Sequence, residues 1–166
     1  MAISNYMAST AGTVVAAASA APFFVIYGSA TKTVNIKRIV VQGPTLTLVE
    51  YITPTLTKYS TAPSGGTTTA ITAVPMDSNY SASTASLLQA YTAAPTAGTS
   101  VGTIGARKIL AQATTAAAAG MVNDTIDFLF TTPIVLRGTA EGVGIRFAGA
   151  PASAVTLSVF VEWSEE

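Results

Sequence analysis

The stretch that decides the fold is VTLSVFVEW, residues 155–163. Its apolar side chains recur at every second position, namely Val155, Leu157, Val159, Val161 and Trp163. Thr156, Ser158 and Glu162 lie between them and would point the opposite way. A period of two is that of a β-strand with one face in a core and the other toward solvent. We therefore expect a long, half-buried strand here.

Shorter runs of the same kind extend back along the chain, each bounded by Gly or Pro. They predict strands at 13–17, 23–27, 34–42, 46–60, 86–92, 101–112, 126–130, 134–136 and 143–147. We expect Gly43-Pro44 to end the strand 34–42, and Pro54 to bend the strand 46–60, because proline cannot donate to a sheet ladder. Turns are expected at 61–69 and 74–79, and a small-residue loop or a single helical turn at 113–120.

About eight to ten short strands without a convincing long helix indicate an all-β domain. The expected fold is a single antiparallel β-sandwich, jelly-roll-like, spanning residues 1–166. Residues 1–22 form either an N-terminal arm or an ordinary first strand. The uncharged run 11–30 could be read as a signal or membrane segment, but no basic residue precedes Lys32 and Gly12, Ser19 and Pro22 interrupt it. Two short strands are the preferred interpretation.

The amino-acid composition limits the classes of function that we expect of this chain. The chain has no histidine and no cysteine, and 10% of its residues are charged, against about 25% in average proteins. Hydrophobic residues make up 49%, which argues against a disordered chain. The net charge is zero and no basic cluster is present, so we expect no binding of nucleic acid or of an anionic membrane. We also expect no enzymatic activity and no cofactor.

Two segments match motifs of serine enzymes. Gly98–Gly102 (GTSVG) fits G-x-S-x-G around Ser100, but that motif needs a strand-to-helix elbow and a histidine base, and the chain has no histidine. Ser29–Lys32 (SATK) fits S-x-x-K, in which lysine replaces histidine. Because it lies between two predicted strands, we expect a turn with a solvated lysine. A hydrolase using Ser100 or Ser29 is the least favoured function.

Other polar groups have simpler explanations. Asn123, Asp124 and Asp127 could hold a structural cation, but they lack the glycine and distal glutamate of a calcium loop, so no metal site is predicted. Asn79 and Asn123 begin glycosylation sequons, which chance explains in a chain this rich in Ser and Thr. Glu162, Glu165 and Glu166 are interpreted as solubilising charges. The scattered tyrosines are either stacking platforms or core residues; they are Tyr6, Tyr51, Tyr59, Tyr80 and Tyr91.

Several stretches resemble small structural proteins of tailed-bacteriophage virions. The resemblance runs from about residue 36 to 166, and its most specific parts are KYSTAPSGGT (58–67), PMDSN (75–79), LQAYTAAPTAG (88–98), LRGTAE (136–141) and VEWSEE (161–166). It implies a β-sandwich cement or decoration protein, commonly a homotrimer, bound to the major capsid protein on the outer surface of the virion and made in the host cytoplasm. It implies no catalytic residues.

The resulting expectation is a non-enzymatic capsid cement protein that stabilises the phage head. The alternative is a head-fibre, tail-fibre or adhesin module that binds host glycan or another virion protein. The charges that we would test at the interface are Lys37 and Arg38 on an early strand, and Arg107 and Lys108 on a later one. Solvated strand positions explain each of them equally well.

Overall fold

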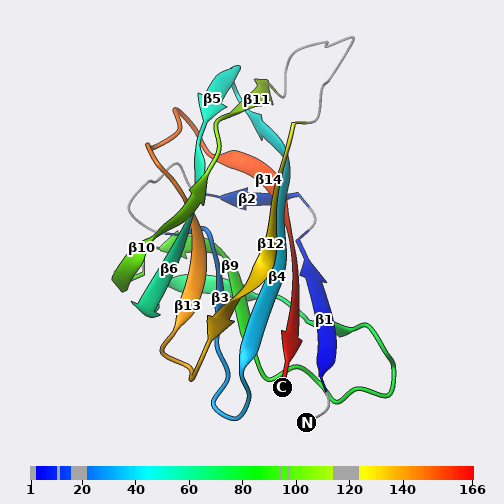
Figure 1. Ribbon diagram of the computed structural model, residues 1–166. Helices are drawn as coiled ribbons and strands as arrows, with labels where there is room; N and C mark the ends of the chain where they lie inside the picture. Colours follow the sequence, from blue (N-terminus) through cyan, green and yellow to red (C-terminus); the bar gives the residue numbers. More distant parts are fainter. Residues whose placement is uncertain (1–2, 11, 16–21, 94, 97, 114–123) are drawn as a thin grey trace.

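A computed structural model describes residues 3–10, 12–15, 22–93, 95–96, 98–113 and 124–166 (Figure 1). Every regular element in these residues is a β-strand, and they contain no helix, so the all-β prediction is confirmed. The strands are β1 (Ser4–Ser9), β2 (Thr13–Val15), β3 (Phe24–Tyr27), β4 (Val34–Leu46), β5 (Glu50–Ile52), β6 (Pro54–Thr61), β7 (Thr67–Ala70), β8 (Val74–Pro75), β9 (Ser86–Ala93), β10 (Thr99–Ala106), β11 (Ile109–Ala113), β12 (Thr125–Leu136), β13 (Gly142–Phe147) and β14 (Val155–Glu165).

The strands form two sheets. The larger, eight-stranded sheet has the order β5-β11-β4-β14-β1-β8, with β12 also paired to β4 and β2 to β14. The smaller, six-stranded sheet has the order β10-β6-β13-β3-β9-β7. The pairing is not purely antiparallel as expected, because β11 runs parallel to β4 where Gln112 and Ala113 meet Thr45 and Leu46. β11 and β12 follow each other along one side of β4, and the loop expected at 113–120 lies outside the described residues apart from Ala113.

Eight of the strands pair in a nested order. The first, β1, pairs with the last, β14; β3 pairs with β13, β4 with β12, and β6 with β10. Two further pairings, β4 with β14 and β6 with β13, join these pairs side by side. The chain therefore runs as one long antiparallel ribbon whose two halves stay together as it passes between the sheets.

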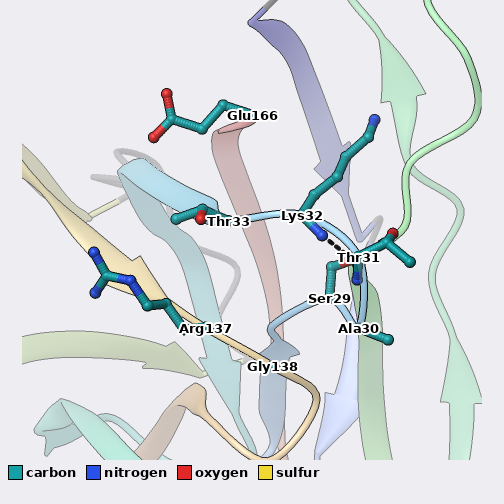
Figure 2. Close-up of a pocket in the computed structure, with 8 residues that line it drawn as sticks. All are labelled: Ser29, Ala30, Thr31, Lys32, Thr33, Arg137, Gly138 and Glu166. Atoms are coloured by element: carbon teal, nitrogen blue, oxygen red, sulfur yellow. Dashed lines mark hydrogen bonds between the residues drawn. The ribbon is translucent and has the colours of Figure 1, made fainter. Parts of the chain in front are cut away.

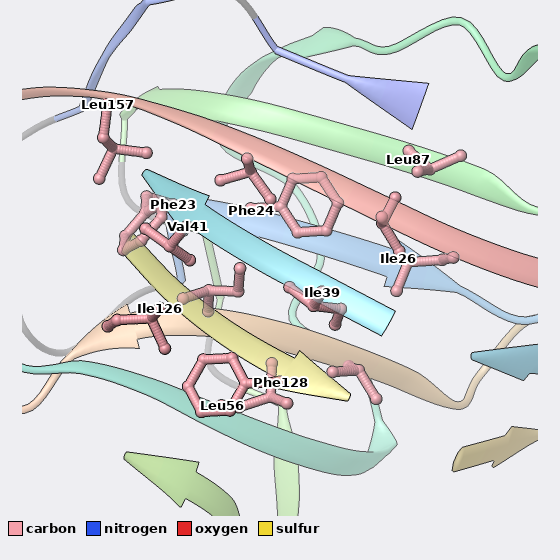
Figure 3. Close-up of a cluster of buried hydrophobic side chains, with 14 of the residues drawn as sticks. Phe23, Phe24, Ile26, Ile39, Val41, Leu56, Leu87, Ile126, Phe128 and Leu157 are labelled. Atoms are coloured by element: carbon pink, nitrogen blue, oxygen red, sulfur yellow. The ribbon is translucent and has the colours of Figure 1, made fainter. Parts of the chain in front are cut away.

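The core lies between the two sheets. A single cluster of buried side chains takes Ile39 and Val41 from β4, and Ile26 and Leu56 from the smaller sheet (Figure 3). Phe128 of β12 covers Gly105 of β10, where a Cβ atom would approach the ring to 2.9 Å. This close approach sets the edge strand β10 against β12, so a side chain at residue 105 would force one of them to move.

The strand at 155–163 is confirmed and extends to Glu165. Its buried positions alternate as expected, and β14 lies between β4 and β1. The indole of Trp163 is fully buried and stacks on Tyr6 with ring centroids 5.7 Å apart. The strand that the sequence marks most clearly is thus a central one in the larger sheet.

Gly43-Pro44 does not end its strand, contrary to expectation. β4 continues to Leu46, and its pairing with β14 passes from Gln42 opposite Ser158 to Thr45 opposite Thr156. Two residues of β4 therefore face one of β14, and Gly43 adopts a φ of 62°. Glycine allows this left-handed conformation, so the pair forms a β-bulge and not a stop.

Two predicted long strands each divide into two. The stretch 46–60 becomes β5 and β6, and the stretch 101–112 becomes β10 and β11; β5 and β11 lie in the larger sheet, β6 and β10 in the smaller one. The two breaks face each other, because Arg107 N donates to Pro54 O at 3.2 Å. Conversely, the strands expected at 126–130 and 134–136 form one strand, β12.

Candidate functional site

The first two predicted interface residues, Lys37 and Arg38, lie on β4. The ammonium of Lys37 donates to Asn5 Oδ1 at 2.5 Å, which ties β4 to β1 across β14. The guanidinium of Arg38 makes a two-pronged contact with Asp127 on β12, with Nη2 to Oδ2 at 2.7 Å and Nε to Oδ1 at 3.0 Å. Both side chains of this pair are about four-tenths exposed. Each cation therefore already has a partner within the chain.

The other two, Arg107 and Lys108, lie where the chain crosses from β10 to β11. Both are exposed. The ammonium of Lys108 sits over the ring of Tyr51, 4.8 Å from its centroid, a cation–π contact. The positive charge of Arg107 also acts on the carboxylate of Asp127, to which Arg38 binds, and helps to lower the pKa of that carboxylate. The structure thus brings Arg38 and Arg107 to one carboxylate and places Lys108 at the end of the molecule formed by β5 and β11.

The contact between Arg38 and Asp127 shifts the pKa of both side chains. The side-chain hydrogen bond from Arg38 lowers the pKa of Asp127, assisted by the charges of Arg38 and Arg107 and opposed by partial desolvation. The same hydrogen bond raises the pKa of Arg38. Both groups therefore stay charged over the ordinary pH range.

Ser100 does not occupy a nucleophile elbow. It lies in β10, opposite Tyr59 of β6, with its side chain exposed on an edge strand. The motif Gly98–Gly102 therefore runs into a strand, as expected, and lacks the strand-to-helix turn that its chemistry requires.

Ser29 and Lys32 form a turn at the end of the molecule that carries the chain termini. Ser29 Oγ accepts from the backbone N–H groups of Thr31 and Lys32, at 3.1 and 3.2 Å. Lys32 is not the solvated lysine that was expected, because its Nζ lies 3.5 Å from the buried carboxylate of Glu165. The serine hydroxyl caps the turn and the lysine balances a charge.

An open depression of about 580 Å³ lies beside this turn and is lined by residues 29–33, Arg137, Gly138 and Glu166. In Figure 2 the side chains of Arg137 and Lys32 extend away from each other. Glu166 adds a negative charge to the same rim. The cations therefore do not converge on one point, as they would in a binding site for an anion.

Glu165, interpreted from the sequence as a solubilising charge, is instead fully buried. Its carboxylate accepts from Ser83 Oγ at 2.6 Å, Thr84 Oγ1 at 2.8 Å, and the backbone N–H groups of Thr84 and Ala85 at 3.1 Å. Trp163 Nε1 also donates to it, at 3.2 Å. Burial would raise the pKa of Glu165, but these hydrogen bonds outweigh burial and lower the pKa to about 2. Period-two alternation from Val161 through Trp163 already pointed this side chain inward.

The tyrosines divide between core and surface. Tyr6 and Tyr59 are buried, and burial raises the pKa of Tyr59. Tyr51 is exposed beneath Lys108 and Tyr80 is half-buried, with its ring 6.4 Å from that of Tyr6. The side chain of Tyr91 lies outside the described part of the structure.

The suggested cation site cannot be assembled from described residues. Asn123, which also begins one sequon, lies outside them, and Asp124 Oδ2 accepts from Leu110 N at 3.2 Å. Within the described ranges no group of three acidic, histidine or cysteine residues could hold a metal. Asn79, which begins the other sequon, is exposed in a turn. Its backbone N–H donates to Asp77 Oδ1.

Most of the large exposed apolar side chains on the described surface gather in three places, while Val14 on β2 and Leu129 on β12 are exposed outside these groups. Leu48, Val49 and Tyr51 lie at the end formed by β5, while Val101 and Ile104 lie on β10. The third group is at β1 and β8 and consists of Ile3, Val74 and Met76. Sequence reasoning concentrated on the four cations and missed these groups.

Compared with known proteins, the chain matches no family model, no curated protein and no solved structure. The resemblance to phage virion proteins therefore stays a prediction. Among the described residues no helix is long and apolar enough to cross a membrane.

Proposed function

We propose that this protein is a non-enzymatic cement protein of a phage capsid, which self-associates, as a homotrimer, on the outer surface of the major capsid protein lattice. The observation that carries the proposal is the combination of a well-buried β core with a chain poor in charge. Only 10% of the residues are charged, and large apolar side chains such as Leu48 and Val101 are more than six-tenths exposed. Apolar groups that are exposed in one chain are favourable to bury against neighbours.

The proposed fold within this function is a jelly-roll sandwich. Its support is the nested pairing of β1 with β14, β3 with β13, β4 with β12 and β6 with β10. A long hairpin ribbon rolled so that its strands fall alternately into two facing sheets gives this pairing, and such double-sheet folds are common in capsid proteins. The fold agrees with a virion role but does not specify one.

The sequence pattern and the fold also fit the chemistry of a lattice protein. Burying few charges keeps the desolvation cost of assembly low. Many weak contacts over a lattice then add to strong overall binding. The four cations Lys37, Arg38, Arg107 and Lys108 remain candidates for contact with the shell; of these, Arg107 and Lys108 are the more exposed.

The test uses capsids assembled without the protein. We expect the purified protein to bind them in a saturable way and to raise the temperature at which they release their contents. Failure to bind, together with unchanged heat resistance, would contradict the proposal. Binding at low copy number without any gain in heat resistance would instead favour the fibre or adhesin function.

A further inference from the structure

Two of the apolar groups lie on opposite lateral edges of the molecule. β10 ends the smaller sheet, and the contact of its Gly105 with Phe128 places it beside β12. β8 ends the larger sheet at the side away from β12, since β4, β14 and β1 lie between them. Both strands have a neighbour on one side only, within the described residues. An edge strand without a second neighbour is a surface on which another chain can pack.

The β10 edge presents two apolar side chains at bulges. Its pairing with β6 jumps from Ser100 to Gly102 and from Thr103 to Gly105, so Val101 and Ile104 are the extra residues. They are 64% and 39% exposed. β10 has no charged residue, and charge is the usual protection of an edge. Because bulges interrupt a regular ladder, this edge favours side-chain packing over continuous strand pairing.

The β8 edge presents a matching apolar group. Val74 lies opposite Met7, and Met76 N donates to Asn5 O, so Val74 and Met76 share the outer face of the larger sheet. Each is 54% exposed, and Ile3, just before β1, is 52% exposed. β8 is uncharged as well.

The charges next to the two edges are opposite in sign. Asp77 directly follows Met76 and is the only charged residue from 59 to 106. Arg107 directly follows β10. Both are exposed, and neither makes a salt bridge within the described part of the chain, although the charge of Arg107 also acts on Asp127. Each edge thus combines exposed apolar side chains with one charge, and the charges are complementary.

We propose that these edges are the two halves of a contact between copies of this chain, with the β10 edge of one copy packed on the β8 edge of the next and Arg107 facing Asp77. Such a contact joins two different surfaces, so it repeats from copy to copy, and in the homotrimer of the proposed function it closes as a ring. The inference rests on the self-association in the proposed function and is independent of capsid binding.

Charge exchange tests the contact directly. We expect Asp77→Arg and Arg107→Asp each to lower the mass of the purified protein in solution toward that of one chain, by placing like charges together. The double variant should regain the wild-type mass, while the exposed Arg137→Asp, at the end that carries the termini, should leave it unchanged. A wild-type mass of one chain, or single variants with the wild-type mass, would overturn the inference.

Cross-linking tests the head-to-tail arrangement, and the absence of native cysteine makes it clean. With a flexible bismaleimide, the Val74→Cys, Val101→Cys double variant should give a ladder that stops at the ring size. Each single variant should stay a single chain on a denaturing gel, as should the control Val74→Cys, Leu48→Cys. Dimers from Val101→Cys alone would indicate a symmetric edge pairing and reject the arrangement.

The two proposals fail in different ways. If the single charge variants have a lower mass in solution than the wild type and the protein binds no capsids, the contact stands and the cement function fails. If the protein binds capsids but shows neither the charge exchange nor the ladder, the function stands and the contact is wrong.

Discussion

The two ends of the molecule hold their polar groups differently. At the end carrying the termini, Glu165 is fully buried and accepts hydrogen bonds from Ser83, Thr84, Ala85 and Trp163. At the opposite end, formed by β5 and β11, polar contacts such as that from Ala152 N to Glu50 Oε2 are exposed. Here the apolar side chains of Leu48 and Val49 also face solvent.

The difference shows how burial determines the strength of an interaction. A buried carboxylate that loses its partners or charge leaves donors without acceptors in a site that water does not reach. An exposed contact exchanges with water at little cost. The first end is therefore fixed by the chain itself, whereas the second leaves apolar area available.

The largest expected effect is that of Glu165→Gln. The amide keeps the size of the side chain but removes the charge opposite Lys32 and places N–H groups against donors. We expect a loss of about 3 kcal/mol in the free energy of unfolding, measured by denaturant unfolding. The neighbouring Glu166→Gln, whose carboxylate is exposed and receives a bond from Asn35, is the control; equal effects of the two changes would contradict the role of Glu165.

Low pH should reduce the contribution of Glu165 to the free energy of unfolding. The pKa of Glu165 is about 2 in the folded chain against an ordinary 4.5, so its contribution is complete above pH 4.5 and is lost as the pH falls through 2. The pKa difference corresponds to roughly 3 kcal/mol. Unfolding measured across this range should show the loss in the wild type. Glu165→Gln should lack that part of the pH dependence, and parallel curves for the two proteins would refute the assignment.

The half-exposed ion pair of Arg38 with Asp127 should contribute less to the free energy of unfolding than the buried Glu165 does. Arg38→Gln removes the half-exposed pair with Asp127, and we expect a small loss in the free energy of unfolding that shrinks as salt is added. Lys37→Gln, which can still donate toward Asn5, serves as the matched variant. A salt-independent loss of several kcal/mol would mean that this pair behaves like the buried end.

The smallest effect is expected at the exposed end. Leu48→Ser with Val49→Ser changes side chains that are 69% and 56% exposed, so the free energy of unfolding should change by less than about 0.5 kcal/mol. Thermal and denaturant unfolding of the purified chain would check this. A strongly destabilised variant would show that the end is packed within the single chain and that the contrast with the Glu165 end is wrong.

Local pattern was a good guide wherever one face of a strand is buried. It predicted the all-β class, the strand at 155–163, and the turn at Ser29, since each depends on residues close in sequence. It missed the divisions at Pro54 and Arg107, because alternation continues through a crossing and does not say which sheet a residue joins. The bulge at Gly43 was missed because the same dipeptide also ends strands.

The sequence alone determined which side chains are apolar and where they alternate. It also determined that the chain carries little charge and no histidine. Tertiary structure alone decided which groups bind the carboxylate of Glu165, since donors from residues 83–85 lie far away in sequence. It also decided that Val101 and Val74 lie on opposite edges, which follows from strand order. The physical reason is common to both: burial and partnership depend on which distant segments meet, and a local period of two carries no information about that.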